Sequence, residues 1–335
     1  MSVEILEQVA LECLADDYGI TGSLVRLSGE NVNFRVSTPE GQQYVLKLVD
    51  EHMPPAVVEL EFALLEHVSR SGFPLDLPQI IRNNHKNLET RIEKRINGLE
   101  RARLIEFVDG DNWEDSVDIS TDLMTDAGLL LGEFNQALSN FDHPAAHRSH
   151  RWNLAEAAQH VTSLELIQDP SERELVRWAF ERFLEVENSL PGLPHQVIHG
   201  DANRANFLVK DGLIVGLVDY GDSCYNPRIC DLAICLAYFM MDLDDPFEAA
   251  SMITSGYTDV VELSEAELEV LLPLICGRLA VSICVATERK AIDPDNPNWY
   301  DSLEPSLELL EKLRQAGMDD SRHTKKLNPG PEPGA

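Results

Sequence analysis

Apolar residues recur along the chain with two different periods, which separate a sheet-forming first third from a mainly helical remainder. Residues 34–36 and 44–49 are apolar and β-branched runs on either side of the turn Thr38-Pro39-Glu40-Gly41. This pattern predicts two strands of an antiparallel hairpin. From residue 118 onward most apolar positions recur every three or four residues, which predicts helices. The chain is therefore expected to have an α+β fold with a small antiparallel sheet and a larger helical part.

The helical pattern extends through most of the chain and stops before its end. Helices are expected over residues 2–18, 54–71, 118–140, 153–167, 170–189, 226–241, 246–260, 264–290 and 301–316. In the helix over 226–241, Asn226 is expected to act as the cap and Pro227 to occupy the first turn. The tail over 321–335 has no apolar content to bury, so it is expected to be disordered or loosely attached.

A second hairpin is predicted around Asp211-Gly212, a residue pair typical of two-residue hairpin turns. Apolar runs flank this turn over residues 207–209 and 213–218. If Lys210 pairs with Leu213, the ladder runs back from the turn toward residue 206.

Three polar residues are expected to meet at the open end of this hairpin. The register places Asn206 opposite Leu217 and Asp219 just beyond it, while Asp201 lies in the loop that enters the hairpin. One aspartate and one asparagine supply the hard oxygen ligands that suit Mg²⁺, and a separate aspartate suits a base for a hydroxyl proton. A single aspartate after a strand is usually a turn or cap residue, but this combination favours a phosphoryl-transfer site.

Two strings carry a resemblance to a known family. HGDANRANFLV and LVDYGD resemble the catalytic loop and metal-binding segment of the aminoglycoside phosphotransferase and choline kinase group, which has a protein-kinase-like fold. DYGDSCYNPRICDLAICLAYFM is most similar to hydroxylysine kinase-like phosphotransferases. The resemblance implies two lobes: a nucleotide-binding sheet lobe over residues 1–103 and a helical catalytic and acceptor-binding lobe over residues 104–320.

The resemblance also implies roles for the residues of these strings. Asp201 would be the catalytic base, and Asn206 and Asp219 would bind Mg²⁺ together with the phosphates of the nucleotide. His199 would support the catalytic loop, and Asp231 would bond the backbone of that loop.

A buried glutamate in the helix over 54–71 predicts an ion pair. Glu61 falls in the middle of the apolar face of this helix, whereas Glu59 falls on the opposite side. A carboxylate in a buried stripe is costly unless it is paired, and Lys47 in the adjacent apolar strand is the natural partner. A strand lysine taken alone is as often a surface residue. We expect a pair of Lys47 with Glu61, with Glu59 as the alternative, and the resemblance implies that this pair directs Lys47 toward nucleotide phosphates.

Two further segments could contact the nucleotide. Gly29, Asn31 and Asn33 form a polar stretch before the first hairpin, and a loop of that kind could lie over the phosphates. Leu104, Glu106 and Phe107 match the segment that joins the two lobes and bonds the purine through backbone groups. The sequence leaves the choice between ATP and GTP open.

The expected acceptor is a small hydroxylated amine or amino acid, with 5-hydroxylysine first. Homoserine, choline, ethanolamine, a sugar and an aminoglycoside remain alternatives. Asp222 lies close enough to the motif to touch a cationic acceptor, and Trp152 resembles a recurrent aromatic residue of the family. Arg278, Glu288 and Arg289 are expected on a solvated helix face, with binding of a substrate carboxylate as the alternative.

Composition narrows the partners and the compartment. The net charge of -31 disfavours nucleic acids and anionic membranes as partners and is compatible with a cationic substrate, although solubility alone also explains it. The six cysteines form no CxxC pair, and the N-terminus is acidic where a signal peptide would be basic, so we expect a cytoplasmic protein. The sequence leaves the oligomeric state open.

Two readings from other functional classes compete with a kinase. A regulatory pseudokinase would bind nucleotide without turnover, but Lys47, Asp201, Asn206 and Asp219 are all present. An acidic scaffold without a nucleotide site would require the whole set to be accidental.

Overall fold

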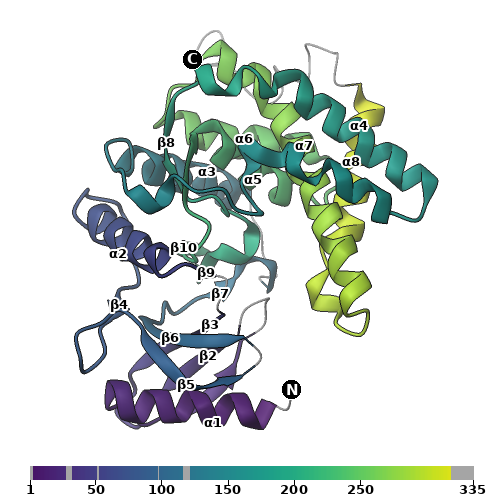
Figure 1. The fold of residues 1–335 in the computed structure, drawn as a ribbon. Helices are drawn as coiled ribbons and strands as arrows, with labels where there is room; N and C mark the ends of the chain where they lie inside the picture. The colour runs from purple at the N-terminus through teal and green to yellow at the C-terminus, as the bar shows by residue number, and fades with distance from the viewer. Residues whose placement is uncertain (1–2, 28–31, 51–52, 97, 116–120, 318–335) are drawn as a thin grey trace.

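The computed structural model describes residues 3–27, 32–50, 53–96, 98–115 and 121–317 of the 335-residue chain. An antiparallel sheet with one helix along its outer side forms a small lobe, and a larger lobe is mainly helical (Figure 1). The expected α+β organisation is confirmed. The tail over 321–335 lies outside the described residues.

The small lobe is built on a six-stranded sheet with the order β1-β2-β3-β6-β4, in which β5 also pairs with β6. Its strands are β1 Ser23–Arg26, β2 Val32–Ser37, β3 Gln43–Asp50, β4 Ile80–Ile81, β5 Thr90–Ile96 and β6 Leu99–Glu106. The predicted hairpin is β2 and β3, with Phe34 opposite Leu46. The lobe boundary expected at Leu104 falls within β6.

The two faces of this sheet have different roles because side chains alternate along each strand. Phe34, Leu46 and Leu104 are buried in one cluster with the apolar side of the helix α1 Val3–Cys13. Lys47, which follows Leu46, therefore projects from the opposite face, where the larger lobe lies (Figure 1). The first predicted helix ends in a π-helical turn, η1 Leu14–Tyr18, which Gly19 closes with a φ of 66°.

The helix α2 Pro55–Ser69 links the two lobes. It follows β3 in sequence, yet its buried residues Leu60, Leu64 and Val68 join the core cluster of the larger lobe. Glu61 is buried on the same helix. The position of α2 therefore depends on the larger lobe as well as on the sheet.

Helices make up most of the larger lobe. They are α3 Thr121–Ala137, α4 Pro170–Glu187, α5 Ile229–Phe239, α6 Pro246–Thr258, α7 Glu265–Ile292 and α8 Leu303–Ala316, with a 3-10 segment η4 Leu154–Leu166. α7 is long and apolar enough to cross a membrane by length and composition, but 89% of its most apolar window is buried inside the protein. It is the central core helix of this lobe.

The larger lobe also contains short strands around the predicted second hairpin. These are β7 Asp111–Asn112, β8 His195–Ile198, β9 Phe207–Lys210, β10 Leu213–Leu217 and β11 Cys224–Pro227. Asp211 and Gly212 form the turn between β9 and β10, both with positive φ values, of 52° and 76°. Asn226 and Pro227 belong to β11, which pairs with β8, so the prediction that they start a helix was wrong.

The register of the second hairpin differs by one residue from the prediction. Lys210 pairs with Leu213 as expected, but an irregularity between Ile214 and Gly216 shifts the ladder, so that Leu217 faces Phe207. Asn206 consequently accepts a backbone hydrogen bond from Val218 at 2.9 Å. The shift is typical of a β-bulge, which places two residues of one strand opposite one of the other.

Candidate functional site

The loop after β8 is fixed to the core of the larger lobe by one buried carboxylate. Asp231 of α5 accepts hydrogen bonds from the backbone N–H groups of His199 at 3.0 Å and Gly200 at 2.9 Å. The side chain of Asn135 on α3 donates a third bond, of 2.8 Å, to the same carboxylate. Because Asp231 is fully buried, these donors satisfy a charge that would otherwise be costly. The resemblance implied this role for Asp231, whereas the contact of Asn135 with it was not predicted.

The same loop crosses the segment that follows β10 at very short range. Gly200 has a φ of 80°, and a Cβ at this position would lie 2.3 Å from the carbonyl oxygen of Asp222. Only glycine fits this crossing. The His199 ring lies within hydrogen-bonding distance of the Val218 carbonyl, at 3.2 Å, and burial lowers its pKa. Packing of the two segments brings Asp201 close to residues 219–222.

Asn206 and Asp201 are in direct contact. The Asn206 amide nitrogen donates to the Asp201 carbonyl at 2.8 Å and to the Asp201 carboxylate at 3.0 Å. Because the nitrogen is engaged, the amide oxygen of Asn206 is the atom that remains for a metal ion.

Asp219 pairs with a lysine of the small lobe. The ammonium of Lys47 lies 2.8 Å from the Asp219 carboxylate. Burial favours the protonated carboxyl, but the Lys47 charge outweighs this effect and lowers the pKa of Asp219 to about 2. The φ of Asp219 is 65°, a left-handed conformation that residues with side chains rarely adopt. A strained, ionised aspartate at this position is consistent with a ligand-binding role.

The expected pair of Lys47 with Glu61 is wrong in this structure. Glu61 instead binds the guanidinium of Arg103 at 2.9 Å, and both side chains are buried. Arg103 lies on β6 directly opposite Lys47 on β3, so both cations project from one face of the sheet. Because the guanidinium of Arg103 pairs with the Glu61 carboxylate, Lys47 pairs with Asp219 instead. The helical projection identified Glu61 correctly as a buried, paired carboxylate but not its partner.

Arg278 of α7 also departs from expectation. Its side chain is only 2% exposed, not solvated, and its guanidinium lies 3.0 Å from the Asp201 carboxylate. It donates to the Trp152 carbonyl at 3.2 Å and stacks near the rings of Trp152 and Tyr238, at 4.7 and 5.3 Å from their centroids. Although 22% of the Asp201 side chain remains exposed, burial raises its pKa to about 7 against the opposing charge of Arg278.

The other two charges assigned to this helix face are also engaged. Glu288 forms an ion pair with Arg151 and accepts a hydrogen bond from Ser163 at 2.7 Å. The guanidinium of Arg289 lies 5.5 Å from the ring centroid of Trp152. The solvated face expected for α7 is therefore largely a packed surface against residues 151–163.

The residues expected to contact nucleotide line the small-lobe sheet. Asn33 was expected in a loop, but it belongs to β2, where it lies opposite Lys47 of β3. Leu104 is fully buried, and the backbone N–H of Glu106 donates to the Gln79 carbonyl at 2.9 Å. The N–H of Phe107 donates to the Gln43 carbonyl at 3.4 Å. These last two amide groups are thus engaged within the small lobe, and contact with a purine stays a prediction.

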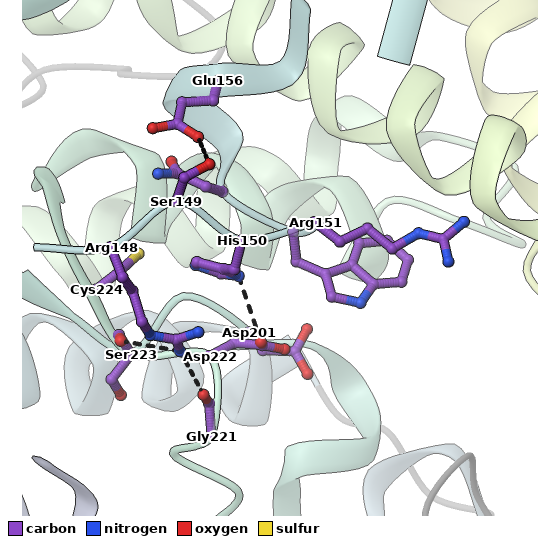
Figure 2. A network of polar contacts seen from close by, with 12 residues as sticks. Arg148, Ser149, His150, Arg151, Glu156, Asp201, Gly221, Asp222, Ser223 and Cys224 are labelled. Carbon is purple, nitrogen blue, oxygen red and sulfur yellow. Dashed lines mark hydrogen bonds and ion pairs between the residues drawn. The ribbon is translucent and has the colours of Figure 1, made fainter. Parts of the chain in front are cut away.

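Two residues of the 147–153 segment, Arg148 and His150, lie beside Asp222 (Figure 2). Figure 2 shows Arg148 reaching the backbone next to Asp222, with hydrogen bonds to the carbonyl groups of Gly221 at 2.6 Å and Ser223 at 3.5 Å. The His150 ring points at the Asp222 carboxylate, with Nδ1 at 3.5 Å from Oδ1. Arg148 and His150 were not among the predicted site residues, because their spacing in sequence carries no recognisable motif.

The donor set is suitable for a hard divalent cation. Asn206 and Asp219 offer oxygen ligands, which Mg²⁺ binds when phosphates and water complete its coordination. In the part of the chain that the structure describes, no group of three or more His, Cys, Asp or Glu residues could hold a metal by itself. A metal at this site would therefore depend on oxygens from a bound nucleotide.

Known proteins are similar in sequence to most of this chain. Residues 23–265 match the model of the phosphotransferase enzyme family, APH. Hydroxylysine kinase from Mus musculus is 25% identical over 298 residues, covering 81% of this chain and 78% of that protein. Homoserine kinase from Zymomonas mobilis subsp. mobilis is 25% identical over 277 residues, covering 78% of this chain and 80% of that protein.

A solved structure extends the likeness to nearly the whole chain. Amicoumacin kinase hAmiN, in complex with AMP-PNP, Ca²⁺ and Ami, superposes with a TM-score of 0.72 at 17% identity, covering 93% of this chain and 96% of that one. The likeness confirms the expected two-lobed, protein-kinase-like fold. Because the family model matches more than half of its residues, the chain belongs to the phosphotransferase enzyme family.

Proposed function

We propose that this protein is a small-molecule kinase that transfers the terminal phosphate of ATP or GTP to the hydroxyl group of an amine or amino acid. The observation that carries the proposal is the convergence of four residues from three segments: Lys47 on β3, Asp201 and Asn206 in the loop before β9, and Asp219 after β10. Asn206 contacts Asp201 at 3.0 Å, and Lys47 of the small lobe reaches Asp219 at 2.8 Å. Phosphoryl transfer requires such positioned charges more than covalent chemistry by the protein.

Each residue has a separate role in this proposal. The Asp201 carboxylate holds the acceptor hydroxyl and takes its proton as the new bond forms. Lys47 binds the nucleotide phosphates once it leaves Asp219. Asn206 and Asp219 would hold Mg²⁺, which neutralises charge on the phosphate oxygens when bound. Glu61 acts through Arg103 and the sheet rather than through Lys47.

The proposed acceptor carries both a hydroxyl and an amine. The relatives are named for hydroxylysine and homoserine, two hydroxylated amino acids. Asp222 supplies a second carboxylate close to Asp201. Its negative charge helps to raise the pKa of Asp201. We take 5-hydroxylysine as the first acceptor, with Trp152 contributing an apolar wall beside Arg278.

The remaining parts of the proposal concern donor, metal and surroundings. The neighbour hAmiN was crystallised with AMP-PNP and Ca²⁺, which supports a nucleotide and a divalent metal, and we propose Mg²⁺ for this chain. All six cysteines are free thiols and buried, which supports action in the reducing cytoplasm. The net charge of -31 supports a cationic small substrate and opposes nucleic acid and anionic membrane as partners.

Nucleotide consumption across an acceptor panel tests the proposal. ATP and GTP are each supplied with Mg²⁺ and with 5-hydroxylysine, homoserine, ethanolamine, choline or an aminoglycoside. We expect acceptor-dependent turnover that falls by about three orders of magnitude or more in Asp201→Ala, while Mg-nucleotide affinity changes little. Turnover that survives in Asp201→Ala would refute its role. Failure to bind any Mg-nucleotide would refute the kinase itself.

A further inference from the structure

One histidine beside the proposed acceptor site lacks the hydrogen bonds that its burial demands. The His150 side chain is 10% exposed and lies in the turn between η3 Pro144–Ala146 and η4. Among the described residues, neither ring nitrogen has a hydrogen-bond partner, although Nδ1 lies 3.5 Å from the Asp222 carboxylate. A buried polar group without a partner costs about 1–3 kcal/mol, so such groups are uncommon in folded proteins. His150 is therefore positioned to form a hydrogen bond with a bound ligand.

The charge state of His150 defines what that partner can be. Burial, with the nearby charges of Arg148 and Arg278, lowers the pKa of His150 to about 3. The ring is therefore neutral at physiological pH and carries one N–H donor and one acceptor nitrogen. Next to it, the Asp222 carboxylate can only accept hydrogen bonds. Two acceptors side by side favour a ligand group rich in N–H donors, and the charge of Asp222 favours a cationic one against the repulsion of Arg148 and Arg278.

The surrounding backbone holds this pair rigidly next to the proposed base. Arg148 binds the carbonyl groups on both sides of Asp222 (Figure 2). The Asp222 carbonyl lies against Gly200, which precedes Asp201 in the chain. A group bound between His150 and Asp222 is thus close to the hydroxyl site at Asp201. Such a site is preorganised, so little ordering entropy is lost on binding.

We infer that His150 and Asp222 form a subsite for the primary ammonium group of the acceptor. The ammonium donates one hydrogen bond to the Asp222 carboxylate and one to the unprotonated nitrogen of His150, while the acceptor hydroxyl lies at Asp201. This inference rests on the proposed kinase function and narrows its substrate class to amines with N–H donors. A trimethylammonium group has none, so choline is excluded as a good acceptor.

Matched acceptor pairs test the subsite. In two pairs the second member lacks every amine: homoserine with 4-hydroxybutyrate, and 5-hydroxylysine with 5-hydroxyhexanoate. In the third pair, ethanolamine with choline, the nitrogen of the second member is trimethylated and has no N–H donor. The variants are His150→Leu, which removes the acceptor nitrogen, and Asp222→Asn, which removes the charge. His147→Leu is the matched control, because this histidine lies in the same segment but is half exposed and pairs with Asp142.

Loss of one hydrogen bond to a charged group is expected to lower kcat/KM about tenfold or more. In His150→Leu this loss should appear for the member of each pair whose amine has N–H donors, mainly in KM, and not for the member without them. The control should retain the wild-type preference. His150→Asn, which keeps a carbonyl acceptor, should recover part of the loss. Unchanged Mg-nucleotide affinity shows that each variant is folded.

Calorimetric binding of the same acceptors, with Mg²⁺ and a non-hydrolysable nucleotide, separates this inference from the kinase proposal. Preferential binding of amines without turnover would overturn the phosphotransfer reaction while supporting the subsite. Equal affinity of the wild type for both members of every pair would overturn the subsite. A wild-type preference that persists in His150→Leu, or the absence of binding by every amine, would overturn it as well.

Discussion

The guanidinium of Arg278 lies 3.0 Å from the carboxylate of Asp201, in a position where only 2% of the arginine side chain meets solvent. The contact joins the central helix of the larger lobe to the proposed catalytic base. Arg278 favours the ionised carboxylate, whereas burial favours the protonated one. The balance raises the pKa of Asp201 to about 7.

The first prediction concerns the pH dependence that follows from this balance. A base must be ionised to accept a proton, so kcat/KM for the acceptor should fall about tenfold per pH unit below pH 7. Arg278→Met removes the cation that lowers the pKa of Asp201, and it should move this acidic limb to higher pH. The conservative Arg278→Lys should move it less. A limb at the same pH in wild type and Arg278→Met would contradict the prediction.

The second prediction concerns the anchor of the catalytic loop. Asp231→Ala removes the acceptor of three buried N–H groups: the backbone groups of His199 and Gly200, and one of the two on the Asn135 amide, which also donates to the Leu131 carbonyl. Unsatisfied buried donors cost about 1–3 kcal/mol each, so the free energy of unfolding should drop by about 3 kcal/mol or more. Urea denaturation measures the change. Asp76→Ala, at an exposed loop position, should change stability by less than about 0.5 kcal/mol.

The third prediction tests the corrected pairing of Glu61. Arg103→Met leaves the buried Glu61 carboxylate without its cation and should destabilise the protein by about 3–5 kcal/mol. Removing both charges in Arg103→Met with Glu61→Leu should cost less than Arg103→Met alone, since no uncompensated charge remains. A double-mutant cycle on thermal or urea unfolding gives the coupling. Strictly additive effects would show that the contact contributes nothing.

The fourth prediction concerns the close packing of α3 against α6. A Cβ at Gly128 would lie 1.9 Å from the Ile253 carbonyl oxygen, and one at Gly256 would lie 2.0 Å from that of Thr125. Gly128→Ala and Gly256→Ala should each force the helices apart and lower the free energy of unfolding by about 3 kcal/mol. Gly192→Ala meets no atom within 4 Å and serves as the control. Wild-type melting temperatures in both helix variants would refute the close contact.

Local patterns predicted the elements of this fold well. The turn at Asp211-Gly212, the hairpin of β2 with β3 and most helices follow from short-range periodicity, because alternation and capping are encoded within a few residues. The bulge in β10 was not predicted, although Gly216 lies at it and an isolated glycine within a strand is a typical signal of a bulge. The bulge moved Asn206 by one position in the register, but the hydrogen bond from Asn206 to Asp201 is still formed.

The contacts that could not be predicted are those between segments far apart in sequence. Arg103, Arg278 and His150 carry no motif, and each acquires its role from a partner 42 to 77 positions away. Helical periodicity marked Glu61 as buried but could not choose between two cations on one sheet face. Helical periodicity also placed the charge of Arg278 within an apolar helix. Because arginine side chains are seldom buried, a solvated position was the expectation.

The ion pair of Lys47 with Asp219 sets an order of events for a phosphoryl-transfer site. The Lys47 ammonium pairs with the Asp219 carboxylate that a metal would bind. Free magnesium would therefore have to compete with Lys47 for this carboxylate. Nucleotide phosphates give the lysine another partner and release the aspartate. Metal and nucleotide should therefore bind as one complex. Lys47 of the small lobe then exchanges its ion pair with Asp219 for an ion pair with the nucleotide phosphates.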